Sequence, residues 1–187
     1  MNELTIIIPF LHEGEEIDNT LKSIRDTAKD KVDILIINDG CTDGYDYEKP
    51  ASQYNAIHYK NKERLGVAGS RDVVVSMCKT PYFLLLDGHM RFFQDDWVEK
   101  TLSVMKEDHR AIYCLQCKNL LPDFTIDENS TPTMGAFVNL TEEESGFYIL
   151  EPHWTYKDPE PEKSVIKIPS VLGAGYAATK EYWQYLR

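Results

Sequence analysis

Cysteine is scarce in this chain, with four residues among 187. They are too few and too scattered for a disulfide framework, so a reducing, cytoplasmic setting is the prediction. Cys114 and Cys117 form a C-x-x-C pair, but no second Cys or His pair lies at zinc-finger spacing. On a strand this spacing places the two sulfurs on opposite faces. We therefore interpret both as small buried residues, in preference to a metal or redox site.

Long hydrophobic runs and basic residues are also scarce. The apolar run from Leu4 to Leu11 is short and contains Pro9, which predicts neither a signal peptide nor an integral membrane segment. Twenty Lys and Arg against 31 Asp and Glu give a net charge of −11. A nucleic-acid partner and an anionic membrane surface both require clustered Lys and Arg, so the charge argues against them. A small anionic ligand stays compatible if a metal ion or backbone N–H groups neutralise it.

What the chain does have is an alternation of buried-type strands and amphipathic helices. Residues 4–9 (LTIIIP) form a continuous β-branched run, and Ile17, Leu21, Ile24 and Ala28 recur at helical spacing. Further strands are expected at 32–37, 56–59, 82–86 and 111–117, and further helices at 67–78 and 97–105. This order predicts an α/β fold with a mostly parallel central sheet flanked by helices.

The alternation stops between residues 118 and 163. This stretch holds five prolines, ten acidic residues and three basic ones, with only brief strand-like pieces such as 136–140. It predicts a long irregular excursion of a functional or mobile kind. Beyond it we expect an edge strand at 166–170, a strand at 176–179 and a helix from Lys180. The prediction is one domain over 1–187, divided into 1–117, 118–163 and 164–187.

Polar clusters follow three of the expected strands, at 9–15, 38–44 and 87–89. Each taken alone is ordinary turn chemistry, because Asn, Asp and Gly are what turns require. Ligands of open α/β sheets, however, bind outside the carboxyl ends of the strands. Three acid-containing clusters at one rim therefore indicate a binding site there.

The Asp87-Gly88-His89 tripeptide is the most specific of these clusters. It follows YFLLL directly, so its carboxylate and imidazole leave the strand end together and can converge on one cation. An oxygen and a nitrogen ligand suit Mn²⁺ or a related divalent ion, which would neutralise a bound diphosphate. The alternative, a turn Asp beside a surface His, is equally compatible with the tripeptide alone.

Four segments in this order resemble a known family. They are IIIPFLHEGEEIDNTLKSI, DILIINDGCTDG, NKERLGVAGSRDVVVSMCKTPYFLLLDGHMRFFQDDWVEKTL and VLGAGYAATKEYW. Together they resemble the nucleotide-sugar-binding half of GT-A fold glycosyltransferases of family 2. The D-x-H motif and the GAGYAATKEYW block are further similar to the polypeptide N-acetylgalactosaminyltransferases.

The resemblance implies a GT-A (Rossmann-like) fold and transfer of a sugar from a nucleoside diphosphate, expected to be UDP, to an acceptor hydroxyl. Mn²⁺ or Mg²⁺ would be the cofactor, the acceptor a glycan, lipid or protein, and the setting cell-surface polysaccharide biosynthesis. Location would be cytoplasmic, with peripheral membrane association left open. Carried over by position, the resemblance implies a uridine pocket lined by Pro9, Phe10 and Glu13, a uracil or ribose ligand in Asp39, nucleotide contacts from Gly66 and Arg71, and metal and diphosphate binding by Asp87 and His89.

Arg71 has a second interpretation, as a structural arginine lying beside the sheet.

Two features depart from the family pattern. His89 replaces the usual second aspartate, and the chain ends at Arg187 inside a helix, where family members continue into segments that supply catalytic groups. We therefore expect a truncated chain and assign no catalytic base. Glu151, His153 and Trp154 are candidate substitutes, although a solvated loop with an aromatic anchor explains them as well.

Two alternatives to a complete glycosyltransferase stay open. One is a donor-binding fragment without turnover. The other is a receiver-like signalling domain that holds Mg²⁺ with acids at strand ends, although the 118–163 excursion has no role in such a domain. The sugar, the acceptor and the stereochemical outcome are not indicated by the sequence.

Overall fold

A computed structural model describes residues 1–156, 165–171 and 173–186. It contains two compact units, one formed by Met1–Ala111 with Ala177–Arg187 and the other by Ile112–Tyr176. The boundaries differ from the predicted division at 117 and 163. That these residues make one glycosyltransferase domain stays a prediction.

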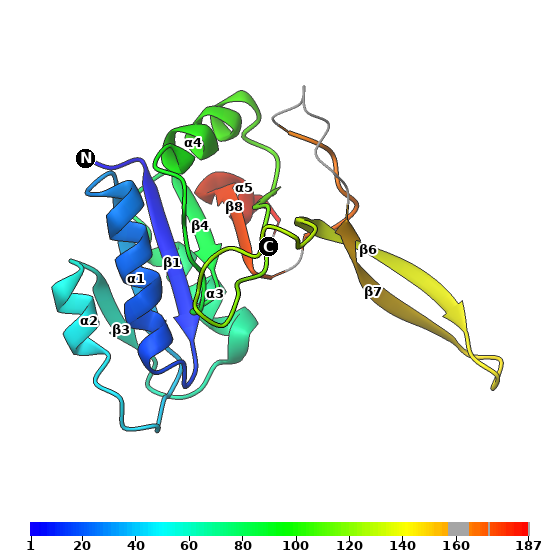
Figure 1. Cartoon of the computed structure of the whole chain (residues 1–187), viewed down its shortest axis with the longest axis horizontal. Helices are drawn as coiled ribbons and strands as arrows, with labels where there is room; N and C mark the ends of the chain where they lie inside the picture. Colours follow the sequence, from blue (N-terminus) through cyan, green and yellow to red (C-terminus); the bar gives the residue numbers. More distant parts are fainter. Residues whose placement is uncertain (157–164, 172, 187) are drawn as a thin grey trace. The chain divides into compact units, whose positions relative to one another are not determined.

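The first unit is an α/β sandwich and confirms the predicted fold class. Its elements in chain order are β1 (Leu4–Phe10), α1 (Glu15–Ala28), β2 (Val32–Asn38), α2 (Glu48–Gln53), β3 (Ile57–Lys60), α3 (Gly66–Met77), β4 (Tyr82–Leu86) and α4 (Trp97–Glu107), followed late in the chain by β8 (Gly175–Thr179) and α5 (Lys180–Tyr185). Within this unit the strands of the sheet follow the order β3-β2-β1-β4-β8. Strand β1 pairs in parallel with β2 and β4, and β2 pairs in parallel with β3 (Figure 1).

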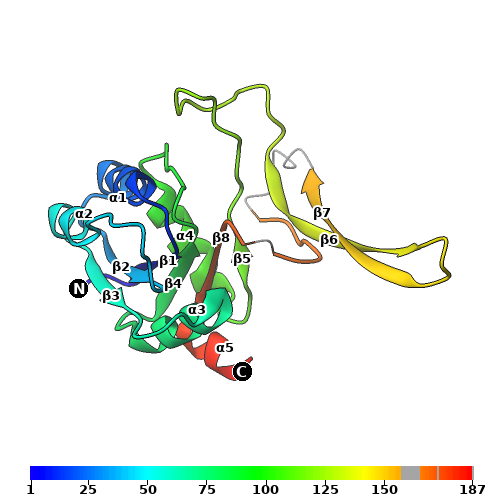
Figure 2. The same ribbon diagram turned by 90° about the horizontal axis from the view of Figure 1, so that it is seen from below.

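Helices cover both faces of this sheet, which explains why its central strands are continuously apolar. Ile6, Ile7 and Ile8 are fully buried, as are most side chains of β2 and β4. Helices α1, α2 and α4 lie on one face, and α3 and α5 on the other (Figure 2). Side-chain hydrogen bonds join the helices on each face: Trp97 Nε1 donates to Thr27 Oγ1 at 3.0 Å, and Lys180 Nζ donates to the Cys78 carbonyl at 2.6 Å.

The second unit is built around an antiparallel hairpin of β6 (Thr133–Glu142) and β7 (Tyr148–Tyr156). The short β5 (Tyr113–Cys114) is followed by Leu115, whose N–H donates to the Gly175 carbonyl of the same unit at 3.0 Å. An isolated antiparallel bridge joins Ala136 to Ser170.

Several sequence expectations require correction. The 118–163 segment is not irregular throughout, because it contains the β6–β7 hairpin, whose strands were predicted only as brief pieces. The strand expected at 111–117 shrinks to two residues, and the one at 166–170 is reduced to the bridge at Ser170. Helix α2 was not predicted, since Pro50 and its short length leave no helical period. Among the described residues, no helix has the length and hydropathy to cross a membrane.

Candidate functional site

A cavity of about 250 Å³ lies at the carboxyl ends of β1, β2 and β4, beside the start of α3. It is lined by Pro9, Phe10, Leu11, Glu13, Asp39, Arg64, Gly66, Val67, Ser70, Arg71, Asp87, Gly88 and His89. Every residue that the sequence assigned to ligand or metal binding is in this set. The assumption behind those assignments, that separate strand ends share one rim, is therefore correct. Their roles toward a ligand stay predictions.

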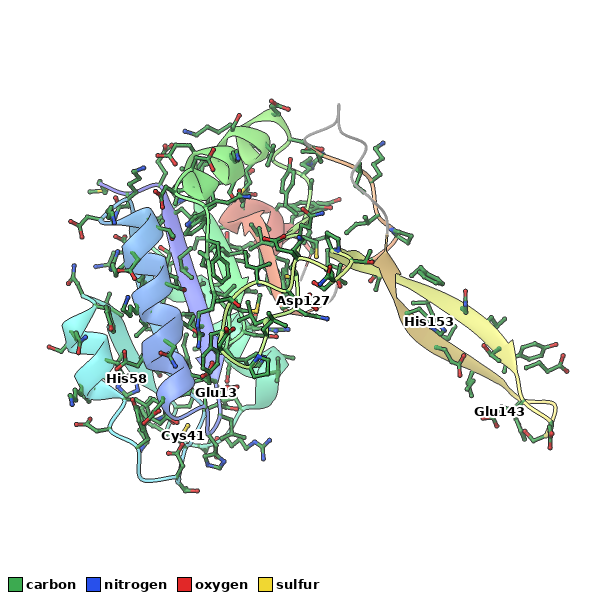
Figure 3. All side chains as sticks on the ribbon, in the orientation of Figure 1. Glu13, Cys41, His58, Asp127, Glu143 and His153 are labelled. Carbon is green, nitrogen blue, oxygen red and sulfur yellow. The ribbon has the colours of Figure 1, made fainter. Side chains whose placement is uncertain are left out.

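Aromatic packing fixes the wall of the cavity formed by the end of β1. The Phe10 ring packs against Tyr47 at 4.5 Å between centroids, with His58 on β3 stacked at 6.4 Å. Phe10 is buried at 4% exposure, because these rings hold it from the side of β2 and β3. Figure 3 shows Glu13, Cys41 and His58 at this same end of the sheet. The wall beside the cavity is thus rigid and aromatic.

Asp39 is the most extensively hydrogen-bonded acid of the site. Its Oδ1 accepts the Asn61 amide at 2.7 Å and the Leu65 N–H at 2.8 Å, and its Oδ2 accepts the Gly66 N–H at 2.9 Å. Ser70 supplies a further hydrogen bond. The carboxylate thus holds the segment entering α3 and neutralises the positive end of that helix.

Burial alone would raise the pKa of Asp39, but the hydrogen bonds from Leu65, Asn61, Ser70 and Gly66 outweigh it and lower the pKa. Asp39 is therefore a carboxylate at neutral pH, with both oxygens engaged. The predicted contact with uracil or ribose is not tested by this geometry. What the geometry does establish is that Asp39 orders the wall of the cavity to which Gly66 and Arg71 belong.

Asp87 lies at the end of β4 with a cation on one side. Arg71 Nη2 approaches Asp87 Oδ1 at 3.5 Å, so the two side chains form an ion pair. Burial raises the pKa of Asp87, and the negative charge of Glu13 acts in the same direction, while His89 and Arg71 oppose them. Such a carboxylate is incompletely compensated and has capacity for a further positive charge.

His89 lies at the mouth of the cavity and pairs with the first loop of the chain. Its Nδ1 is 3.1 Å from Glu13 Oε2. Gly88, between the two predicted metal ligands, permits this pairing, since a Cβ there would lie 2.9 Å from Glu13 Cγ and 3.0 Å from Ile17 Cδ1. The D-G-H spacing therefore has a steric reason: the glycine gives Glu13 room to reach His89.

Helix α1 supports the Asp87–His89 turn from behind. Thr20 Oγ1 donates to the Gly88 carbonyl at 2.7 Å, and Arg91 donates to Thr20 Oγ1 at 3.2 Å and to Glu16 Oε2 at 2.8 Å. The sequence analysis did not identify Thr20, Glu16 or Arg91, nor Arg64 and Ser70 in the cavity wall. A buried threonine on the apolar face of a helix and an arginine four residues after Asp87 were the available signals.

The donor set at this turn is compatible with a divalent ion. One carboxylate oxygen and one imidazole nitrogen suit Mn²⁺ or Mg²⁺ with further oxygens from a ligand or water. Over residues 1–156, 165–171 and 173–186, no group of three or more His, Cys, Asp or Glu is arranged as a complete metal site. Asp87 and His89 would thus provide only part of a coordination sphere, as in a site that a ligand completes.

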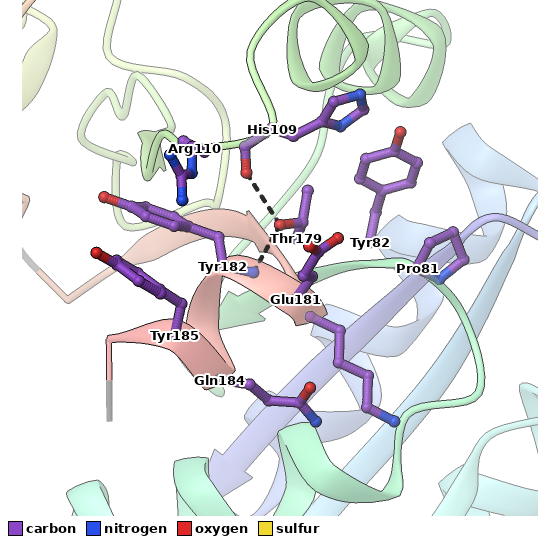
Figure 4. Close-up of a pocket in the computed structure, with 10 residues that line it drawn as sticks. Pro81, Tyr82, His109, Arg110, Thr179, Glu181, Tyr182, Gln184 and Tyr185 are labelled. Atoms are coloured by element: carbon purple, nitrogen blue, oxygen red, sulfur yellow. Dashed lines mark hydrogen bonds between the residues drawn. The ribbon is translucent and has the colours of Figure 1, made fainter.

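A larger cavity, of about 740 Å³, opens at the opposite end of β4. Tyr82, Arg110, Tyr182 and Tyr185 are among the residues that line it, with Arg110 over the Tyr185 ring at 5.3 Å (Figure 4). Thr179 Oγ1 caps α5 by accepting the Tyr182 N–H. None of the residues predicted for ligand or metal binding lies there.

The candidate substitutes for catalytic groups lie on β7 of the second unit. His153 stacks on Phe137 at 5.4 Å and its Nε2 is 3.7 Å from Glu151 Oε2. The side chain of Trp154 lies outside the described residues, as does the end of the predicted excursion, from residue 157 to residue 163. The four cysteines are free thiols, and Cys114 and Cys117, which were expected to be buried, are only partly buried.

The family model of glycosyl transferase family 2 matches residues 5–158. This chain belongs to glycosyl transferase family 2. The family 2 chain is 34% identical over 122 residues to a cholesterol galactosyltransferase of Borreliella burgdorferi. The matched residues make up 61% of this chain and 32% of that protein. It is 32% identical over 96 residues to a teichoic acid poly(glycerol phosphate) polymerase of Staphylococcus epidermidis, covering 46% of this chain and 13% of the polymerase. It thus spans about a third or less of these relatives.

Solved structures show the fold of the family 2 chain to be GT-A. The mannosyltransferase PcManGT from Pyrobaculum calidifontis, in complex with GDP-Man and Mn²⁺, matches with a TM-score of 0.53 and 16% identity, over 62% of this chain and 36% of that one. TarS residues 1–349 of S. aureus match with a TM-score of 0.52 and 15% identity, over 72% and 42%.

Proposed function

We propose that the 250 Å³ cavity binds a nucleoside-diphosphate sugar, and that the protein transfers this sugar to an acceptor hydroxyl. One observation carries the proposal: side chains from four separate segments, each selected from sequence for this chemistry, line one cavity at the carboxyl edge of the sheet. Membership in glycosyl transferase family 2 supports the same chemistry.

The base and ribose fit the end of the cavity near β1 and β2. Phe10 offers an aromatic edge held by Tyr47, and Pro9 and Glu13 flank it. We propose UDP as the nucleotide, on the resemblance of the four motifs. The complex of the Pyrobaculum mannosyltransferase holds GDP-Man, so GDP is the competing nucleotide. Both present the same diphosphate to the rest of the cavity.

The diphosphate fits the end near Asp87. Arg71 and Arg64 line the cavity and supply positive charge in a chain of net charge −11. Asp87 and His89, the D-x-H pair similar to that of polypeptide N-acetylgalactosaminyltransferases, would hold Mn²⁺ or Mg²⁺. When bound, such an ion neutralises charge on the diphosphate as it leaves. Glu13 holds His89 in place, and Arg71 balances Asp87 before ligand binds.

The acceptor side stays open in this proposal. The relatives are named for transfer to cholesterol and for poly(glycerol phosphate) synthesis, so a lipid and a growing polymer are both compatible acceptors within the family. A cytoplasmic location, peripheral to the membrane, and a role in cell-surface polysaccharide biosynthesis belong to the same proposal. No catalytic base is assigned, so donor binding without turnover is the alternative. The receiver-like alternative has no support, since the family 2 match spans most of the chain.

Calorimetric titration tests donor binding directly. The chain should bind UDP in the presence of Mn²⁺, and Asp87→Ala should weaken that binding by at least about tenfold, as expected when a charged group that holds the metal is lost. Asp95→Asn, an exposed acid outside the cavity, is the control and should bind as the parent chain does. Absence of metal-dependent binding of both UDP and GDP, or equal affinity in Asp87→Ala, contradicts the proposal.

A further inference from the structure

His12 has a positive φ, which is uncommon for a residue other than glycine. Its φ is +57°, in the left-handed region that glycine, asparagine and aspartate favour among turn residues. It lies in the loop between β1 and α1, with an exposed side chain. A non-glycine residue in this region costs about 1 kcal/mol or more, so surrounding contacts must hold it there.

Those contacts all reach the loop that follows β2. The His12 N–H donates to Cys41 Sγ at 3.1 Å, and His12 Nε2 accepts the Thr42 N–H at 2.9 Å. Thr42 Oγ1 lies 3.2 Å from the same nitrogen. Because a backbone N–H can only donate, Nε2 carries no proton in this arrangement, and the ring hydrogen is assigned to Nδ1.

A second link joins the same two loops near their other ends. The Gly14 N–H donates to Tyr47 Oη at 2.8 Å, and Tyr47 Oη donates to Asp43 Oδ2 at 2.5 Å. Burial and the hydrogen bond to Asp43 raise the pKa of Tyr47, so it keeps its proton and this direction of donation. His12 and Gly14 on one loop are therefore tied to Thr42 and Asp43 on the other.

Glu13 lies between these two anchored residues. Its carboxylate meets His89 at 3.1 Å, and its methylene packs against Gly88 so closely that no Cβ would fit there. A small rotation of the loop at His12 would move Glu13 away from His89. The backbone and imidazole contacts of His12 thus determine where Glu13 lies within the cavity.

We infer that His12 is a positioning residue for nucleotide binding: its imidazole accepts the Thr42 N–H and so holds the loop that presents Glu13 to the cavity. The inference rests on the proposed donor site but adds a residue outside its lining. His12 does not touch the ligand in this assignment. It acts through the backbone of Thr42 and through the orientation of Glu13.

A matched pair of variants isolates the acceptor atom. In His12→Gln the amide oxygen takes approximately the place of Nε2, whereas His12→Met has similar length and backbone preference but no comparable acceptor. Affinity for UDP with Mn²⁺ should fall by about fivefold to tenfold in His12→Met, as expected for the loss of one hydrogen bond. It should stay within about twofold of the parent in His12→Gln. The two variants should melt at the same temperature. A purely structural role of His12 would instead give the two variants different melting temperatures.

Amide hydrogen exchange without ligand provides a second measurement. The amides of Gly14 and Thr42 should exchange faster in His12→Met than in His12→Gln. Equal exchange or equal UDP affinity in the two variants overturns the inference. A parent chain that binds neither UDP nor GDP, with exchange that still differs between the variants, contradicts the proposed donor site and leaves the loop contact itself established.

Discussion

The two units of this chain differ in how far their strands bury apolar side chains. In the first unit, β1, β2 and β4 bury Ile7, Ile36 and Leu84 completely, because helices cover both faces of the sheet. In the second unit, the β6–β7 hairpin leaves Leu140 at 64% and Leu150 at 72% exposure, although register pairs them directly. A two-stranded hairpin has no second layer, so its own fold cannot remove these side chains from water.

The same contrast applies to polar groups. Three acids of the first unit are held in place: Asp39 by four donors, Glu13 by His89 and, in helix α1, Glu16 by Arg91. The acids at the hairpin turn, Glu143 and Glu144, are exposed. Side chains that must hold a ligand need such fixed positions, so the proposed chemistry resides in the first unit.

Truncation of a core side chain gives the largest expected difference between the units. Phe83→Ala removes a fully buried ring from β4 that packs edge-on against Trp183 at 5.5 Å, and should lower the free energy of unfolding by about 3–5 kcal/mol. Leu150→Ala on the hairpin should change it by less than about 0.5 kcal/mol. Chemical denaturation measures both. Similar losses for the two variants would mean that Leu150 is covered in solution, and would remove the contrast.

What the sequence predicted follows the same division. The strands of the first unit, its longer helices and the residues proposed for ligand and metal binding were predicted because burial on both faces leaves uninterrupted apolar runs, as in Leu4–Phe10, and because polar clusters follow them directly. The full hairpin was not predicted because its exposed strands show only a weak alternation of polar and apolar residues. Asn139, Thr141 and Glu151 alternate with apolar residues only in part, and Pro152 lies within β7. Roles such as that of Thr20 require tertiary contacts that no local pattern contains.

Glycine substitutions within the second unit test whether the hairpin has any packed part. At Gly135, with φ of +99°, an added Cβ would lie 2.6 Å from the Ser170 carbonyl oxygen and closer still to Ile168. Gly135→Ala should destabilise the unit by about 2–4 kcal/mol, through backbone strain and overpacking together. Gly146→Ala at the turn, with φ of +78° and open space, should cost about 1 kcal/mol from strain alone. Hydrogen exchange of the hairpin amides distinguishes them, and equal effects would show that the base of the hairpin is not packed.

Replacement of Asp39 tests the fixed acids of the first unit. Asn offers one acceptor oxygen in place of two, so Asp39→Asn should lose about 2 kcal/mol of stability at pH 7. Because the pKa of Asp39 is lowered in the folded chain, its contribution is present above the unfolded value of about 3.9 and is lost as pH falls through the folded pKa. Urea denaturation at pH 7 and near pH 3 should therefore show a smaller difference between Asp39→Asn and the parent at the lower pH. A difference that grows on acidification would contradict the lowered pKa.

Exposed and enclosed ion pairs give the smallest expected contrast. Lys118 and Glu128 of the second unit pair at 2.8 Å, with Glu128 77% exposed, so Lys118→Met should change stability by no more than about 0.5 kcal/mol. Arg91 and Glu16 of the first unit pair at the same distance with the Arg91 side chain only 9% exposed, and Arg91 also bonds to Thr20 and the Met90 carbonyl. Arg91→Met should therefore cost about 2 kcal/mol. It should weaken UDP binding as well, because Thr20 and the Gly88 turn lose their support.

High salt should erase the effect of Lys118→Met on stability and leave most of the effect of Arg91→Met, since buried pairs are screened less. If salt removed both equally, the Asp87–His89 turn would be no better fixed than the surface of the hairpin unit, and its assignment as a preorganised site would fail.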